Sequence, residues 1–126
     1  MNSVLDLSDR LSVLPILHAN GDFALEVRRH LTVLQPDCIA LPLPPSFAES
    51  VEEGVEALPH ISVAIQREIT LEGAYNYVPI DPCQGVVAAV RTGMDMGIDR
   101  AYIDLEVDSY EESELLLPDP YALKEV

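Results

Sequence analysis

Strand-length apolar runs alternate with amphipathic helical segments along most of this chain, and this alternation restricts the fold more than any other feature. Continuous apolar runs are typical of strands that are covered on both faces, whereas amphipathic helices repeat apolar residues every three or four positions. We therefore predict an α/β fold, a three-layer sandwich with a mainly parallel sheet in the order β-α-β-α-β-β-α-β. The strands are expected at residues 13–19, 38–43, 61–66, 75–80 and 100–106.

Capping residues predict where the helices begin. Asn20 is expected to cap a helix that ends near residue 35, where Pro36-Asp37 follows. Ser46 and Glu49 form an S-x-x-E capping box at the start of the second helix. Asp81 followed by Pro82 predicts a third helix start.

Turn and breaker residues predict how the remaining elements end and connect. The link between the strands at 61–66 and 75–80 is too short for a crossover, which favours a β-hairpin. Pro79 cannot donate a ladder hydrogen bond, so this strand is expected to lie at a sheet edge or to end there. Gly97 supplies the left-handed residue that ends the third helix.

Length and charge limit the possible classes of protein. The 126 residues fit one α/β domain, with a core at about 13–107 and an acidic tail at 108–126 that opens a further helix, as in the front part of a longer protein. A net charge of −15 argues against binding to nucleic acid or to an anionic membrane surface. No signal peptide or membrane-spanning run is visible, so we expect a cytoplasmic location and reduced cysteines.

Polar side chains gather at the carboxyl ends of the predicted strands, where ligands bind in open α/β sheets. His18 ends the first strand, and Asp104 and Glu106 alternate with apolar residues in the last, so both are expected to project from one face. A histidine with carboxylates can hold a divalent metal ion or perform acid–base chemistry. We predict His18, Asp104 and Glu106 as catalytic residues, with His18 and Asp104 as metal ligands.

Structural roles stay open for His18 and for Asp81, which also follows a predicted strand. His18 can equally be a hydrogen-bonded residue of the turn, and Asp81 can be no more than a helix cap. The chain has no G-x-G-x-x-G turn, no Walker lysine, no G-x-S-x-G elbow and no H-E-x-x-H pair, and nucleotide binding is disfavoured.

Two passages resemble the erythromycin-esterase/ChaN/TraB-like superfamily. The first is ILHANGD at 16–22, then a helix and LQPDCIAL at 34–41; the second is YVPIDP at 77–82, then a helix and GIDRAYIDL at 97–105. The resemblance implies a hydrolase or metal site at His18 and Asp104, joined by Glu106, in a protein longer than this chain. This sequence also departs from the family's pattern in the turn at His18 and in the proline-rich segment after the second predicted strand.

Two functions of different classes follow from these observations. The first is the N-terminal part of a larger hydrolase-like or metal-binding protein. The alternative is a non-catalytic interaction or regulatory module that docks another domain or self-associates. The expected partners are a second copy, as in a homodimer, or C-terminal domains of a longer chain, while the residues do not identify a small-molecule ligand.

Overall fold

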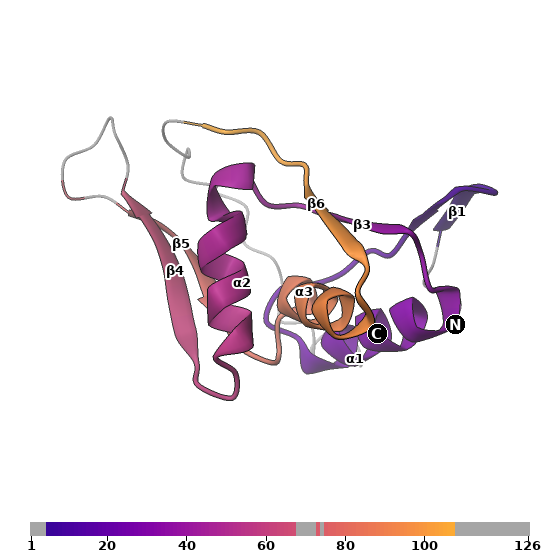
Figure 1. The fold of residues 1–126 in the computed structure, drawn as a ribbon, viewed down its shortest axis with the longest axis horizontal. Helices are drawn as coiled ribbons and strands as arrows, with labels where there is room; N and C mark the ends of the chain where they lie inside the picture. Colours follow the sequence, from indigo (N-terminus) through magenta and orange to yellow (C-terminus); the bar gives the residue numbers. More distant parts are fainter. Residues whose placement is uncertain (1–4, 68–72, 74, 108–126) are drawn as a thin grey trace, which may run out of the picture.

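Strands and helices alternate through the computed structural model, which describes residues 5–67, 73 and 75–107. The predicted acidic tail lies outside the described residues. Two strands precede the first helix, and an antiparallel pair precedes the last (Figure 1). The elements are β1 Leu5–Ser8, β2 Leu11–Val13, α1 Gly21–Leu34, β3 Cys38–Leu41, the 3₁₀ turn η1 Pro45–Phe47, α2 Ala48–Glu56, β4 Ser62–Arg67, β5 Tyr75–Ile80, α3 Gly85–Met96 and β6 Asp99–Tyr102.

Strand pairing within the described residues gives three two-stranded sheets, so the α/β class is confirmed in its coarse form. β3 and β6 are parallel, with Cys38 opposite Asp99 and Leu41 opposite Tyr102. β4 and β5 form the predicted antiparallel hairpin, and β1 pairs with β2 in the same sense. Among these pairs only β3–β6 is parallel.

The predicted strand at residues 13–19 is wrong. β2 ends at Val13, residues 14–17 have no regular structure, and a turn follows at His18 and Ala19. Pro15 lacks an N–H group for a sheet ladder, and Ala19 takes a left-handed backbone conformation with a φ of 55°. Leu14 and Ile16 instead pack against the core as partly buried side chains, which explains why the run is apolar without being a strand.

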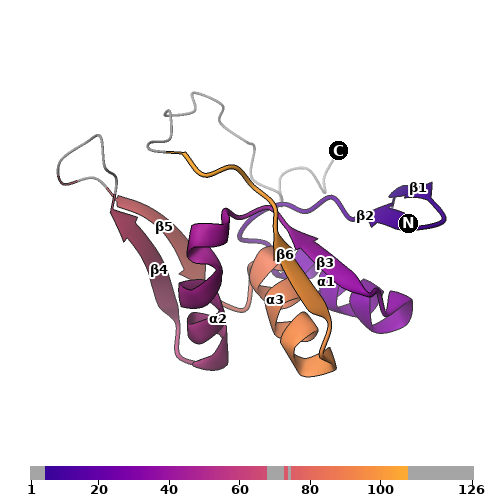
Figure 2. The ribbon, with the colours of Figure 1, turned by 45° about the horizontal axis from the view of Figure 1, so that its top comes forward.

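The core is centred on α3, whose residues are buried on most sides. Val87 and Val90 of α3 are buried together with Val51 and Val55 of α2 and with Leu41 of β3. Two views show α3 in the middle of the molecule, with α2 on one side and α1 on the other (Figure 1 and Figure 2). The amphipathic stripe of α2 therefore packs inward, as its spacing predicts.

The helix ends agree with the sequence at two positions and differ at a third. The side chain of Asn20 caps α1 by accepting a hydrogen bond from the N–H of Asp22, and Gly97 ends α3 with a φ of 67°. The predicted start of α3 at Asp81-Pro82 is wrong, because α3 begins at Gly85 with Gln84 at its N-cap. Asp81 organises the preceding turn instead, by accepting a hydrogen bond of 2.8 Å from the N–H of Cys83.

The helices of the described segments include none that is long and apolar enough to cross a membrane.

Candidate functional site

Parallel pairing places the chain after β3 beside the chain after β6, which is where ligands bind in open α/β sheets. The two segments stay in contact beyond the strands. Ile103 N–H donates to the carbonyl of Leu41 over 3.1 Å, and Asp104 N–H donates to the carbonyl of Leu43 over 3.2 Å. These contacts bring Asp104 and Glu106 to the predicted edge of the sheet.

Glu106 binds the start of the second helical segment. Its carboxylate accepts hydrogen bonds from the backbone N–H of Ser46 over 2.6 Å and from the Ser46 hydroxyl over 2.8 Å. Gln66 Oε1 lies 3.5 Å from the same hydroxyl. A carboxylate that accepts from an otherwise unpaired N–H at such a position stabilises the first turn.

The predicted capping box of Ser46 and Glu49 is wrong. Ser46 lies inside the 3₁₀ turn, and neither η1 nor α2 has a side-chain cap from its own N-cap residue. Glu106 takes the role that the sequence pattern assigns to Glu49. The sequence carries no local signal for this contact, because Ser46 and Glu106 are 60 positions apart.

Asp104 uses its carboxylate locally. Its Oδ1 accepts a hydrogen bond of 2.8 Å from the N–H of Leu105, and the side chain is exposed. β6 ends at Tyr102, so Asp104 and Glu106 follow the strand and their expected alternation on one strand face is wrong. The two carboxylates therefore bind different groups, the adjacent backbone in one case and Ser46 in the other.

His18 lies in the exposed turn before α1, and this turn contacts the start of α3. The N–H of Ala19 donates to Gln84 Oε1 over 3.0 Å, and Gln84 in turn donates to the carboxylate of Asp81 over 3.2 Å. Within residues 5–67, 73 and 75–107, no hydrogen bond or ion pair joins His18 to Asp104 or Glu106.

These positions also show whether the described side chains could hold a metal ion. Among the residues that the structure describes, no three His, Cys, Asp or Glu side chains are close enough together to hold a metal ion. His18 and Asp104 stay predicted ligands, and no chemical step is derived through a metal at them.

A polar cluster that sequence reasoning missed joins α2 to β6. Arg100 Nε donates to Glu52 Oε1 over 2.8 Å, its second nitrogen lies 3.3 Å from Glu52 Oε2, and the Tyr102 hydroxyl donates to Glu52 over 3.3 Å. Arg100 also donates to the carbonyl of Ile98 over 2.7 Å. The one signal for it in the sequence is Arg100, a lone cation at the start of the strand predicted at 100–106.

The surroundings of this cluster shift the pKa of two groups. The hydrogen bond from Arg100 holds the pKa of Glu52 below its usual value, against the opposing effect of burial. Burial, reinforced by the charge of Glu52, raises the pKa of Tyr102 to about 12. The cluster therefore stays an ion pair with a neutral phenol near neutral pH, which suits a structural role better than proton transfer.

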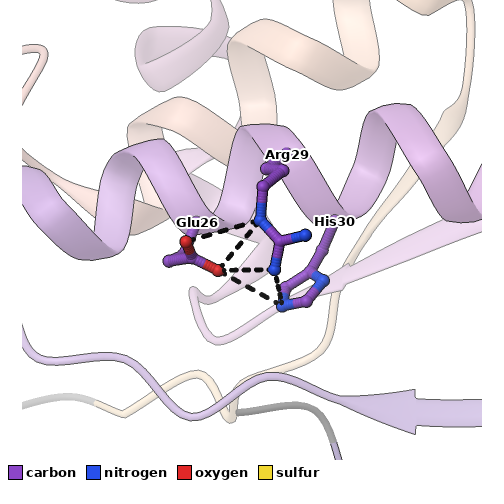
Figure 3. Close-up of polar contacts among 3 residues, drawn as sticks. All are labelled: Glu26, Arg29 and His30. Carbon is purple, nitrogen blue, oxygen red and sulfur yellow. Dashed lines mark hydrogen bonds and ion pairs between the residues drawn. The ribbon is translucent and has the colours of Figure 1, made fainter. Parts of the chain in front are cut away.

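A second group of ionisable side chains lies on the surface of α1 (Figure 3). Arg29 donates to Glu26 over 2.9 Å, and His30 Nε2 lies 3.5 Å from the same carboxylate oxygen. The hydrogen bond from Arg29 lowers the pKa of Glu26. These are contacts three and four positions apart along one exposed helix face, which is the arrangement of a helix-stabilising network.

Comparisons with protein families, with characterised proteins and with solved structures give no match to this chain.

Proposed function

We propose that this chain is a non-catalytic interaction module that docks another protein domain on the open face of the β3–β6 sheet. One observation carries the proposal. Ile39 and Leu41 of β3 are buried against the helices, whereas Cys38 and Ala40, which alternate with them, are exposed on the other face. The small, uncharged side chains of Cys38 and Ala40 suit close packing by a covering element.

Parallel sheets occur almost always with both faces covered, because the backbone crossovers place helices on each side. The segment that follows β6 adds apolar surface near the same edge, since Ile103 is 65% exposed and Leu105 is 77% exposed. A docked domain that covers this surface would supply the outer layer of the three-layer sandwich predicted from the sequence. Further parallel strands beside β3 and β6 would then complete the mainly parallel sheet.

The two cysteines provide a test with an internal control. Cys38 lies on the open face, Cys83 precedes α3, and both thiols are exposed. Trypsin places them in separate peptides because Arg67 lies between them in the chain. Isotope-coded iodoacetamide applied to the purified chain, and separately to cells that make the protein naturally, gives the labelling ratio of Cys38 to Cys83 under each condition.

A docked partner in the cell should lower this ratio at least about tenfold, the reduction expected when nine molecules in ten are covered at Cys38. Cys83 corrects for differences in reagent entry and redox state. An unchanged ratio would show that the β3–β6 face is uncovered in the cell and would overturn the proposal.

The second candidate is the N-terminal part of a longer, cytoplasmic hydrolase-like or metal-binding protein. The close approach of the segments after β3 and β6 supports it, because Glu106 and Asp104 lie at the edge where such sites form. Among the described residues, His18 makes no hydrogen bond or ion pair with either carboxylate, so the support comes from the two acidic residues. A thermal-shift titration with divalent metals tests this, since no stabilisation by any of them would argue against a metal site.

A further inference from the structure

The β4–β5 hairpin presents an apolar face to solvent at one end of the molecule. α2 packs against its inner face, where Ala64 and Ile80 are buried (Figure 1 and Figure 2). The opposite face carries Ile65, 60% exposed, directly across from Tyr77, 69% exposed. The register continues this face as a ladder of three cross-strand pairs, Val63 with Pro79, Ile65 with Tyr77 and Arg67 with Tyr75.

The outer face of the hairpin differs from the rest of the chain in its charge. The six outward positions of the two strands hold one cation, Arg67, and no carboxylate. The whole chain has 22 acidic and 7 basic residues. A basic partner therefore finds no counter-charge here, whereas a second copy brings no carboxylate against a carboxylate at this face.

The area is sufficient for a specific interface. The exposed fractions of the six outward side chains correspond to roughly 600 Å² per copy. Two copies whose faces cover each other completely would therefore bury about 1,200 Å², the lower bound for specific protein interfaces. A patch of this size also lies at the upper end of what a monomer usually exposes, roughly 300 to 600 Å².

We propose that two copies of this chain pack face to face through the outer faces of their β4–β5 hairpins. A two-fold axis along the strand direction, between the two sheets, exchanges the positions of β4 and β5. Ile65 then lies over Tyr77 of the second copy, and Val63 lies over the second copy's Pro79. Arg67 lies over the ring of Tyr75 of the second copy, a cation–π arrangement. The side chains of the two outer faces can then interdigitate, as they do between packed sheets.

This dimer goes beyond the proposed docking function, because it uses the hairpin instead of the β3–β6 face and its partner is a second copy of the chain. Sedimentation equilibrium of the 126-residue chain under reducing conditions measures it directly. We expect a dimer at about 100 µM. Ile65→Glu should raise the dimer dissociation constant at least about 100-fold, since each dimer would bury two introduced carboxylates.

Val33→Glu is the matched control, because Val33 is 77% exposed on α1, away from the hairpin. It should leave the dissociation constant within about threefold. Tyr77→Thr keeps a residue that favours strands and removes the ring, so it should weaken the dimer about tenfold without unfolding the hairpin. Far-ultraviolet circular dichroism checks that each variant is folded.

A wild-type chain that stays monomeric at about 500 µM would overturn the proposal. So would a dimer that Tyr77→Thr does not weaken, or one that Val33→Glu weakens as much as Ile65→Glu does. Cys38 lies on the β3–β6 sheet and not on the hairpin, so its labelling in the cell tests the docking proposal separately. Either proposal can therefore fail while the other stands.

Discussion

The Ser46 hydroxyl binds a carboxylate that is distant in the sequence although another lies nearby. Glu49 is three positions away, at the spacing of a capping box, yet the Ser46 hydroxyl donates to Glu106 over 2.8 Å. One reason is that the 3₁₀ turn at Pro45–Phe47 alters the backbone geometry that a capping box needs. The other is that the segment after β6 places Glu106 next to the N–H of Ser46.

We expect Glu106→Ala to lower the free energy of unfolding by about 1 kcal/mol, because the N–H and hydroxyl of Ser46 lose a charged acceptor. Glu49→Ala removes an exposed carboxylate of the same helix and should change it by less than about 0.5 kcal/mol. Urea denaturation of the two variants measures both values. Equal losses, or a larger loss for Glu49→Ala, would contradict the contact described here.

The ionisation of Tyr102 should lower the free energy of unfolding at alkaline pH. Its pKa is raised to about 12 in the folded chain by burial and by Glu52, against about 10 for an unfolded tyrosine. The unfolded state therefore loses this proton first as the pH rises, so the stabilising contribution is complete below pH 10 and is lost as the pH approaches 12.

The stability of the wild-type chain relative to Tyr102→Phe should accordingly fall by about 1 to 2 kcal/mol between pH 10 and pH 12. Urea denaturation at several pH values measures the difference, and the other tyrosines cancel because both proteins contain them. A difference that stays constant across this range would show that Tyr102 ionises alike in both states.

Close packing between elements decides which substitutions the core can accept. α2 approaches the hairpin at Gly54, where an added Cβ would lie 3.0 Å from Ile80 Cγ1 and 3.0 Å from Ser62 Oγ. Ile80 is fully buried, so it has no space into which to move. Glycine is used here for proximity, although it is a poor helix former.

Gly54→Ala should therefore lower the free energy of unfolding by about 1 kcal/mol. The gain in helix propensity, about 1 kcal/mol, is smaller than the cost of overpacking, about 1 to 3 kcal/mol. Glu53→Ala is the control at the neighbouring exposed position. Thermal and urea denaturation give both values, and a stabilised Gly54→Ala variant would show that α2 can move away from the hairpin.

Two exposed sheet faces characterise the part of the molecule that the structure describes. The outer face of β3 exposes Cys38 and Ala40, and the outer face of the hairpin exposes Ile65 and Tyr77. A net charge of −15 makes copies of the chain repel one another, which opposes association most strongly at low salt. A docked domain on the first face and a second copy of the chain on the other would cover both of these faces.

Part of this structure follows from the sequence alone, because the relevant contacts are local. The Asn20 cap, the Gly97 helix end and the apolar stripe of α2 depend on residues within a few positions of one another. The hairpin is local in the same sense. Each was predicted from spacing and residue type.

Tertiary structure decided the rest, because competing local choices differ by less free energy than long-range packing supplies. The apolar run after Val13 packs on the core instead of extending a sheet, because Leu14 and Ile16 make long-range contacts there. Likewise, only the pairing of β3 with β6 brings Glu106 to Ser46. The candidate site was therefore predictable as an edge of the sheet, but the partners of its residues were not.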